Sequence, residues 1–421
     1  MNLVVHPSTL KGKIDIPASK SIMHRALICG ALSDGHCIIE NSYLSEDILA
    51  TIHCLEQLGA CFDIHQNHIS VTGISNIPKS ALLDCNESGS TIRFLIPIAA
   101  AFGISATFSG KGKLITRPLD LYQKAFAQKG VQFEYTGTLP ASIQGTLLPG
   151  HYTIRGNVSS QFITGLLFAL PLLDGPSTLE VLPPFESKSY VDITLDVLAA
   201  FGIKIQSHDN CYQIAGNQRY LPINYQVESD YSQAAFFLTA NCLGSQVQLH
   251  QFSKSSIQGD SYIIGLLNQI GANPILEDDG FTNQGKDFIG FSIDASNIPD
   301  LVPILSVLAC FCHGKSVISK VERLKIKESD RIASTLELIS RLGGSISYQD
   351  DSIVILPCHQ FHGAEINSYH DHRIAMAAAI AATRATDDVV ILGAECVNKS
   401  YPTFFKEYKR LGGNCDAIYL E

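Results

Sequence analysis

The chain has 421 residues, a hydrophobic content of 46% and a formal net charge of −10. This length predicts two domains, because a single hydrophobic core rarely grows beyond roughly 250–300 residues. The acidic balance argues against a general nucleic-acid-binding protein, for which a basic face is expected. It leaves room for a small anionic ligand held by a local group of Lys and Arg.

Twelve Cys are scattered along the chain without a CxxC pair. No secretory signal is expected in Met1–Lys13, so these residues are interpreted as reduced, mostly buried thiols of a cytoplasmic protein. The longest apolar runs, such as Leu301–Cys312, are short of the roughly 18 residues needed to span a bilayer. Neither a membrane, a metal ion nor a cofactor is expected.

In chain order, the predicted elements repeat with a period of about seventy residues. Apolar helices that end in a Gly are predicted to stop at Leu58-Gly59, Lys129-Gly130, Phe201-Gly202, Ile270-Gly271, Leu342-Gly343 and Leu411-Gly412. A second series of nearly all-apolar stretches begins at Ser19, Ser88, Ser159, Ser229, Pro299 and His370. Two interleaved series with one period predict six copies of a single structural unit.

The last copy shows the plan of a unit. His370–Ala382 is apolar nearly all round, which predicts a helix buried on every side. A strand is expected at Val389–Leu392, an amphipathic helix at Lys399–Arg410 and a closing strand at Ala417–Leu420. Gly412 suits the left-handed residue that ends a helix.

The other copies follow the same plan. An alternating strand comes after the Gly, as in Cys61–Ile64 or Ile203–Gln206, and a return strand follows, as in His68–Val71 or Ile353–Leu356. Three units that bury their apolar helices together make one pseudo-threefold domain, so six units predict two, divided near residues 225–228. The pattern alone does not assign the strand Asn2–Val5 to either domain.

Cations stand at the beginnings of the predicted helices, where the helix dipole disfavours them. They are Lys20, Arg25, Arg93, Arg117, Lys327, Arg331, Arg373 and Lys399. Several lead into helices that should be buried all round, so their charged groups need partners. Helix beginnings also offer unpaired N–H groups to phosphate and carboxylate. We therefore expect a site for a strongly anionic ligand at these helix ends.

Nine segments, in order along the whole chain, resemble the 5-enolpyruvylshikimate-3-phosphate synthases of the enolpyruvyl transferase family. They are Ile16–Arg25, Ser88–Arg93, Thr116–Pro118, Val158–Gln161, Ser187–Tyr190, Ile298–Asp300, Ile326–Arg331, Asp371–Arg373 and Lys399. The resemblance implies an α/β fold of two inside-out domains, each with three repeats of about 70 residues. It places residues 15–226 in the N-terminal domain, and residues 1–14 with 227–421 in the C-terminal one.

The resemblance also implies the substrates and their binding residues. The N-terminal domain would mainly bind shikimate 3-phosphate, and the C-terminal domain would carry much of the phosphoenolpyruvate site and the proton-transfer residues. Phosphoenolpyruvate would be held by Lys20, Gly89, Arg93, Arg117, Gln161, Arg331, Arg373 and Lys399. Shikimate 3-phosphate would be held by Lys20, Ser21, Arg25, Ser159, Ser160, Gln161, Ser187, Tyr190, Asp300, Arg323 and Lys327. The protein is expected to act as a monomer.

The implied reaction is an addition followed by an elimination, with Asp300, Glu328, Lys20 and His372 as the catalytic set. Asp300 would accept the proton of the attacking 5-hydroxyl. Glu328 or a nearby Lys would protonate the methylene carbon of phosphoenolpyruvate, and the tetrahedral intermediate would then lose phosphate. A simpler interpretation of Asp300 is the N-cap of the helix that follows it, and a simpler role for His372 is that of an orienting donor.

Three other functions are compatible with parts of this pattern. A UDP-N-acetylglucosamine enolpyruvyl transferase would carry a reactive Cys before Arg117, but the loop Gly110–Pro118 contains none. A non-catalytic anion-binding relative would be expected to lose Asp300, Glu328 and His372, which are present. An RNA-terminal cyclase-like protein would need nucleotide-binding features, which are not found. Glu87, a carboxylate where the family usually has Asn, is left outside the predicted site.

Overall fold

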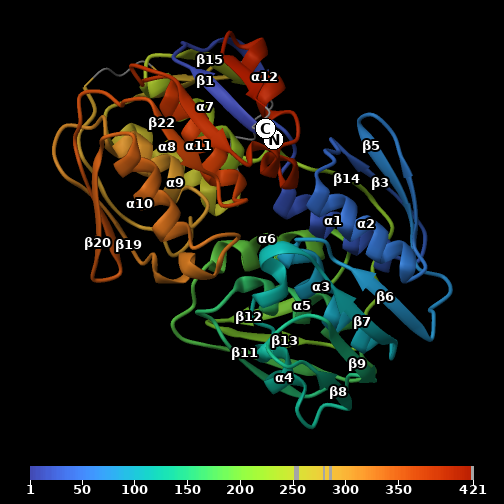
Figure 1. Cartoon of the computed structure of the whole chain (residues 1–421). Helices are drawn as coiled ribbons and strands as arrows, with labels where there is room; N and C mark the ends of the chain where they lie inside the picture. Colours follow the sequence, from blue (N-terminus) through green and yellow to red (C-terminus); the bar gives the residue numbers. More distant parts are fainter. Residues whose placement is uncertain (251–255, 278–279, 284–286, 419–421) are drawn as a thin grey trace. The chain divides into compact units, whose positions relative to one another are not determined.

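The computed structural model describes residues 1–250, 256–277, 280–283 and 287–418 (Figure 1). The chain forms two compact units. The N-terminal unit is Ala18–Val227, and the C-terminal unit combines Met1–Pro17 with Glu228–Glu421. The sequence analysis expected the chain to pass from one domain to the other after residues 14 and 226, whereas the units divide after Pro17 and Val227. Across the described residues, no helix has both the length and the apolar character needed to cross a membrane.

The N-terminal unit contains three four-stranded sheets with one shared topology. Their strand orders are β14-β3-β5-β4, β6-β7-β9-β8 and β10-β11-β13-β12. In each sheet the first pair is parallel and the other two are antiparallel. The strands are β3 (His36–Glu40), β4 (Cys61–Ile64), β5 (His68–Thr72), β6 (Ser80–Asp84), β7 (Ser105–Ser109), β8 (Val131–Glu134), β9 (Ala141–Gly145), β10 (His151–Arg155), β11 (Ser177–Leu182), β12 (Ile205–His208), β13 (Cys211–Ile214) and β14 (Asn224–Gln226).

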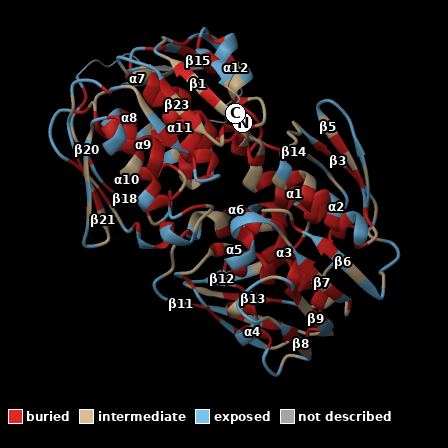
Figure 2. Ribbon diagram, in the orientation of Figure 1, coloured by how far each residue is buried: buried red, intermediate tan, exposed pale blue. Residues whose placement is uncertain are grey.

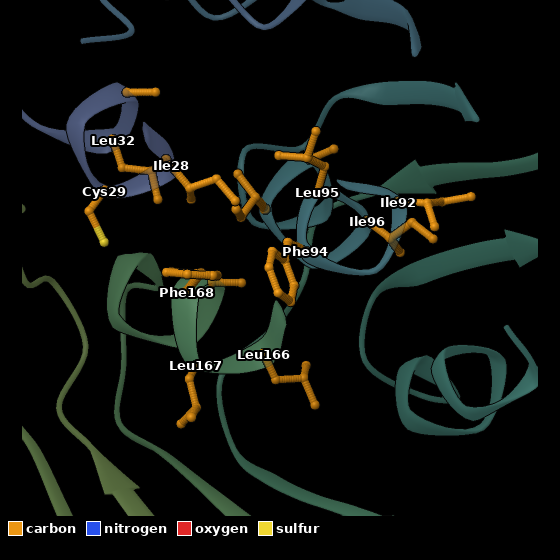
Figure 3. Packing of buried hydrophobic residues seen from close by; sticks show 14 of the residues in the cluster. Ile28, Cys29, Leu32, Ile92, Phe94, Leu95, Ile96, Leu166, Leu167 and Phe168 are labelled. Carbon is orange, nitrogen blue, oxygen red and sulfur yellow. The ribbon is translucent and has the colours of Figure 1, made fainter. Parts of the chain in front are cut away.

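The helices of this unit alternate with the sheets. They are α1 (Lys20–Leu32), α2 (Glu46–Gln57), α3 (Gly89–Ala101), α4 (Asp120–Phe126), α5 (Ser160–Ala169) and α6 (Lys188–Ala200), with the 3₁₀ helices η1 (Gly112–Thr116) and η2 (Leu170–Leu172). The apolar helices α1, α3 and α5 bury nearly every residue, as their composition predicts. Phe94 of α3 meets Phe168 of α5 edge to face, with ring centroids 5.6 Å apart (Figure 3).

The C-terminal unit repeats the same sheet topology three times. Its strand orders are β16-β17-β15-β2, β18-β19-β21-β20 and β22-β23-β1-β24. The strands are β1 (Asn2–His6), β2 (Lys11–Asp15), β15 (Gln246–His250), β16 (Pro274–Glu277), β17 (Gly280–Asn283), β18 (Ser292–Asp294), β19 (Ser316–Ser319), β20 (Ser345–Gln349), β21 (Ser352–Leu356), β22 (Ala364–Asn367), β23 (Val389–Leu392) and β24 (Asn414–Ile418). The first strand, β1, lies between β23 and β24, which places it in this unit.

Three apolar helices form the core of the C-terminal unit. Helices α7, α9 and α11 pack against one another, and α11 is buried along its whole length (Figure 2). The helices of this unit are α7 (Tyr231–Cys242), α8 (Tyr262–Gln269), α9 (Val302–Ala309), α10 (Arg331–Arg341), α11 (His372–Ala382) and α12 (Phe404–Arg410), with η3 (Gly259–Ser261), η4 (Glu322–Ile326) and η5 (Ala394–Lys399). Both units therefore have the helix-inside, sheet-outside arrangement that the repeat predicts.

The six predicted helix-ending glycines all have a positive φ, between +79° and +104°. This conformation costs Gly little, and it turns the chain from each helix into the next strand. They are Gly59, Gly130, Gly202, Gly271, Gly343 and Gly412. The predicted period is thus confirmed at the level of the backbone.

Some predicted element boundaries were wrong. The amphipathic helix expected from Lys399 begins only at Phe404, because Pro402 cannot continue a helix and restricts the residue before it. The closing strand begins at Asn414 rather than Ala417, and Leu420 lies outside the described residues. The strand expected at Ile203–Gln206 occupies Ile205–His208, after the turn that follows Gly202.

Gly165 marks the closest approach within the N-terminal core. A Cβ at this position of α5 would lie 2.2 Å from the carbonyl oxygen of Arg93 and 2.2 Å from the Tyr122 hydroxyl. Both groups belong to one polar contact, since Tyr122 Oη donates to Arg93 O at 2.5 Å. The absence of a side chain at Gly165 lets α3 and α5 come together.

We predict that Gly165→Ala destabilises the protein by about 2–3 kcal/mol, because the added methyl forces α3 and α5 apart. The measurement is the shift of the urea unfolding midpoint. Gly265→Ala is the matched control: this Gly also lies inside a helix, α8, and its Cβ would meet nothing within 4 Å. The control should be neutral or stabilising. Equal midpoints for the two variants would contradict this account of the core.

Candidate active site

Each unit gathers several of the predicted cations at the beginnings of its helices. In the N-terminal unit, Lys20 opens α1 and its Nζ lies 2.7 Å from Oδ2 of Asp47, in the first turn of α2. Both side chains are largely buried, at 18% and 14% exposure. Asp47 was not among the predicted site residues. An acid in the first turn of a helix is so common that its sequence position gives no signal.

Arg93 and Arg117 come together over the beginning of α3. A Cβ at Gly89 would lie 2.6 Å from Nη1 of Arg117 and 2.9 Å from Nη1 of Arg93. Arg93 also donates to Gln161 Oε1 at 2.8 Å, and Gln161 Nε2 donates to Ser90 at 3.0 Å. Two guanidinium groups close to a helix N-terminus form a suitable environment for a phosphate or carboxylate group.

Arg25 is held deep inside the N-terminal unit. Its Nε donates to Thr194 at 2.8 Å, its Nη1 to the Ser21 carbonyl at 2.5 Å and its Nη2 to the Tyr190 carbonyl at 2.9 Å. Burial lowers the pKa of Arg25 to about 10, which still leaves it charged at neutral pH. These contacts fix the beginning of α6 relative to α1.

Three predicted serines lie at or next to helix N-caps. Ser159 is the N-cap of α5 and accepts from the Gln161 amide, and Ser160 is buried beside it. Ser187 is the N-cap of α6 and takes a left-handed conformation with φ +53°. Such a backbone costs a non-glycine residue free energy and is often found at functional sites. Tyr190 follows in the first turn of α6.

Glu87, the unusual carboxylate before α3, lies against the loop that leads to Arg117. A Cβ at Gly112 would meet Glu87 Oε2 at 2.5 Å, and Gly112 has a φ of +53°. The Glu87 carboxylate is thus packed on the first residue of η1. This contact gives Glu87 a place in the structure of the loop.

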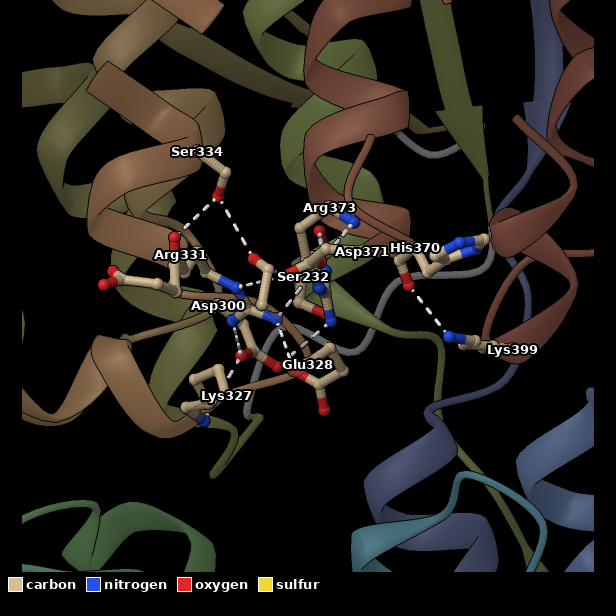
Figure 4. A network of polar contacts seen from close by, with 12 residues as sticks. Ser232, Asp300, Lys327, Glu328, Arg331, Ser334, His370, Asp371, Arg373 and Lys399 are labelled. Atoms are coloured by element: carbon tan, nitrogen blue, oxygen red, sulfur yellow. Dashed lines mark hydrogen bonds and ion pairs between the residues drawn. The ribbon is translucent and has the colours of Figure 1, made fainter. Parts of the chain in front are cut away.

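The C-terminal unit builds a network of buried charges around Arg331 (Figure 4). Arg331 has a side chain that is 1% exposed, and its guanidinium binds three carboxylates. Nη1 lies 2.8 Å from Asp300, Nη2 lies 2.7 Å from Glu328 and Nε lies 2.9 Å from Asp371. Burial lowers the pKa of Arg331, but the charges of Asp371, Glu328 and Asp300 outweigh it and raise the pKa overall.

Asp300 forms ion pairs with three cations. Besides Arg331, Arg373 Nη2 lies 3.1 Å from its Oδ2 and Lys327 Nζ lies 3.7 Å from its Oδ1. Burial by itself would raise the pKa of Asp300, but the charges of Arg373, Lys327 and Arg331 hold it well below the usual range. The N-cap of α9 is Leu301, so the simpler interpretation of Asp300 as a helix cap is wrong.

Lys327 has an unusual environment for a lysine. Burial lowers its pKa to about 8, with Arg323 and Arg331 adding to the shift and Asp300 opposing it. Arg323 is buried in η4, the 3₁₀ helix that ends directly before Lys327. Lys327 can therefore gain or lose a proton close to neutral pH.

The remaining predicted residues lie around α11. Asp371 is the N-cap of α11 and accepts from the Arg373 amide at 2.9 Å, while His372 is buried in the first turn. Arg373 also donates to Ser232 at 2.7 Å, a contact that the sequence did not reveal. Lys399 is buried and its Nζ donates to the carbonyl of His370 at 2.8 Å. These contacts bring the beginnings of α7, α10 and α11 into one polar cluster.

A protein-family model described as EPSP synthase (3-phosphoshikimate 1-carboxyvinyltransferase) matches residues 4–408. The chain belongs to the EPSP synthase family. A relative from Clostridium novyi, named 3-phosphoshikimate 1-carboxyvinyltransferase, is 42% identical over 427 residues and covers 99% of this chain and 98% of its own. One from Clostridium kluyveri with the same name is 42% identical over 415 residues, covering 98% and 97%.

Solved structures of the family share the fold of this chain. An EPSP synthase structure from Acinetobacter baumannii aligns with a TM-score of 0.83 at 26% identity and covers 99% of both chains. A second EPSP synthase structure from that organism aligns with a TM-score of 0.82 at 26% identity and covers 100% of both chains. The expected enolpyruvyl transferase fold is thereby confirmed.

We predict that Asp371→Asn lowers the stability of the protein by about 2–4 kcal/mol, because it takes one carboxylate from a fully buried Arg. Asn still serves as an N-cap, so the change isolates the lost charge. The measurement is the urea unfolding midpoint. Asp120→Asn, in the exposed ion pair of Asp120 with Lys124, is the control and should change it by less than about 0.5 kcal/mol. A similar shift in both variants would contradict the assigned importance of the network.

Proposed function

We propose that this protein transfers the enolpyruvyl group of phosphoenolpyruvate to the 5-hydroxyl of shikimate 3-phosphate and releases phosphate. Membership of the EPSP synthase family supports this reaction, as do relatives named for it at 42% identity. The observation that carries the proposal is the ionised Asp300 held among Arg331, Arg373 and Lys327. Such a cluster combines a potential base with groups that bind anions.

In this proposal the N-terminal cluster binds anionic groups of the substrates. Arg93 and Arg117, side by side over Gly89, suit the bidentate recognition of a phosphate or carboxylate group. Gln161 is already oriented by Arg93 and Ser90. The assignments for Lys20, Ser21, Ser159, Ser160, Ser187 and Tyr190 remain as the family resemblance implies. Arg25 acts by fixing the carbonyl groups of Ser21 and Tyr190.

Asp300 is proposed as the base that takes the proton of the 5-hydroxyl. Two Arg and one Lys stabilise its ionised form, which keeps it deprotonated at neutral pH but also weakens it as a base. Substrate anions that bind Arg331 and Arg373 would draw these cations away from Asp300. The pKa of Asp300 would then rise, so that ligand binding itself activates the base.

Lys327 is proposed as the proton donor to the methylene carbon, in preference to Glu328. A lysine with a pKa of about 8 holds its proton at neutral pH and can still release it. Glu328 accepts from Arg331 at 2.7 Å, so carrying a proton would require it to break that ion pair. In this scheme Lys20 binds the substrates and His372 serves as an orienting donor.

The decisive test is phosphate release by the purified protein with phosphoenolpyruvate and either shikimate 3-phosphate or UDP-N-acetylglucosamine. We expect release with shikimate 3-phosphate alone. The loop Gly110–Pro118 lacks the Cys expected of the UDP-N-acetylglucosamine enzymes, which supports this choice. Release with UDP-N-acetylglucosamine would favour that transferase, and release with neither would favour a non-catalytic anion-binding protein. The expected monomeric state and cytoplasmic location stay predictions.

Asp300→Asn should lower kcat by roughly 10²–10⁴-fold while shikimate 3-phosphate still binds, because it removes a base but few contacts to the anionic groups. Stopped assays of phosphate release measure kcat, and titration calorimetry measures the binding of shikimate 3-phosphate. Asp294→Asn, at an exposed carboxylate of the same unit, is the control and should behave as wild type. Undiminished turnover in Asp300→Asn would remove Asp300 as the base.

The affinity for shikimate 3-phosphate should fall as the pH rises through about 8, because Lys327 loses its charge there. The substrate phosphate is fully ionised above pH 7, since its second pKa is about 6, so the change belongs to the protein. Calorimetric titrations from pH 7 to 9.5 would measure it. Lys327→Arg keeps its charge over this range and should give a flat profile. An equally steep fall in that variant would place the titrating group elsewhere.

A further inference from the structure

Two Cys of the C-terminal unit meet at the end of α9, away from the polar cluster around Arg331. Cys310 is the C-cap of α9, and Cys358 follows β21 after a single Pro. The backbone N–H of Cys358 donates to the carbonyl oxygen of Cys310 at 2.7 Å. The Cys310 thiol donates to the Ser306 carbonyl oxygen at 3.3 Å. The backbone contact holds the two Cα atoms within the separation of about 4.4–6.8 Å that a disulfide requires.

We propose that Cys310 and Cys358 form a redox site, in which a hydroperoxide such as hydrogen peroxide oxidises the pair reversibly to a disulfide. The proposal is independent of the enolpyruvyl transfer reaction. A rise of about 1.5 Å per residue places Cys310 roughly 15 Å along α9 from Asp300, so neither thiol takes part in that chemistry.

The surroundings of the two thiols give them different roles. Cys358 is partly exposed, whereas Cys310 is buried. The neighbouring Cys310 side chain lowers the pKa of Cys358; burial opposes this shift, and the charge of Arg384 and the backbone of Gln360 add to it. The Arg384 guanidinium is positioned over the Phe311 ring, 5.4 Å from its centroid. Cys358 is therefore the attacking thiolate, and Cys310 is the thiol that completes the bridge.

The chemistry balances with one molecule of peroxide. The Cys358 thiolate attacks one peroxide oxygen, the O–O bond breaks, and a sulfenic acid and hydroxide are formed. The Cys310 sulfur then attacks the Cys358 sulfur, and the S–O bond breaks. The departing hydroxide takes the remaining thiol proton. Overall, two thiols and one peroxide give one disulfide and two waters, and a dithiol reductant reverses the change.

Other Cys of this chain serve as comparisons for the proposed pair. Cys312 is also buried, and its thiol donates to the Leu308 carbonyl at 3.5 Å, just as the Cys310 thiol donates to Ser306 at 3.3 Å. In the N-terminal unit, the Cys54 thiol donates to the carbonyl of Asp84, the residue before Cys85, at 3.3 Å, and both Cys are buried. Burial raises the pKa of Cys85 well above its usual range. A buried thiol without an accessible thiolate partner should stay reduced under mild oxidation.

A bridge from Cys310 to Cys358 would close the segment that contains β19, η4, α10, β20 and β21. This segment carries Lys327, Glu328 and Arg331. A cross-link that closes a long loop lowers the conformational entropy of the unfolded chain and so stabilises the folded state. Oxidation should therefore raise the thermal unfolding midpoint, and the phosphate-release activity of Cys358→Ser should equal that of the wild type.

The test treats the full-length protein with a small excess of hydrogen peroxide and counts its free thiols after denaturation. We expect the loss of two thiols and of about 2 Da, a linked peptide containing Cys310 and Cys358, and full recovery with dithiothreitol. Cys61→Ser, which removes an exposed thiol, should form the same bridge. Cys310→Ser should leave Cys358 as a sulfenic acid that dimedone traps.

Cys358→Ser should lose no thiol pair and show no rise in its unfolding midpoint on oxidation. The proposal is overturned if Cys358→Ser also loses two thiols under the same oxidation. It is also overturned if the linked peptide joins Cys310 to Cys312 or Cys54 to Cys85, or if Cys310 and Cys358 both stay reduced in the wild type at a dose that oxidises Cys61.

Discussion

A cation at the beginning of a buried helix needs a partner, and this requirement organises the polar interior of both units. Water cannot solvate such a charge, so the free energy lost on burial must be recovered from protein groups or ligands. Lys20 binds Asp47, Arg93 binds Gln161, and Arg331 binds three carboxylates. Apart from Glu328, which lies just before α10 itself, these partners come from other elements, so the charged contacts also fix how the helices pack.

The same contacts explain how a strongly ionised carboxylate can serve as a base. Asp300 is stabilised by the cations that are proposed to bind the substrate anions. Protein carboxylate and substrate anion therefore compete for Arg331 and Arg373. When a ligand takes these cations, Asp300 loses the charges that depress its pKa, and its affinity for a proton increases. Binding and proton transfer are thus coupled through two guanidinium groups.

The sequence predicted the fold well because its signals are local and repeated. The six Gly with positive φ, the apolar run that follows Arg373 in α11 and the six repeated units can all be recognised from short segments. The partners of the charged groups could not be predicted from pattern, since Asp47 and Ser232 look like ordinary residues at helix beginnings. The pattern could not assign β1, because its pairing strands lie nearly four hundred residues away, and only the family resemblance placed it in the C-terminal domain. Long-range contacts of this kind leave no periodic trace.

The central claim, that Arg331 and Arg373 restrain Asp300 until an anion binds them, can be measured by carboxyl NMR titration with ¹³C-labelled aspartate. Asp300→Asn identifies the resonance. The account predicts a pKa well below the usual range in the free protein and a clearly higher one with phosphoenolpyruvate and shikimate 3-phosphate bound. An Asp300 pKa that is normal in the free protein, or one that does not rise when the ligands bind, would contradict it.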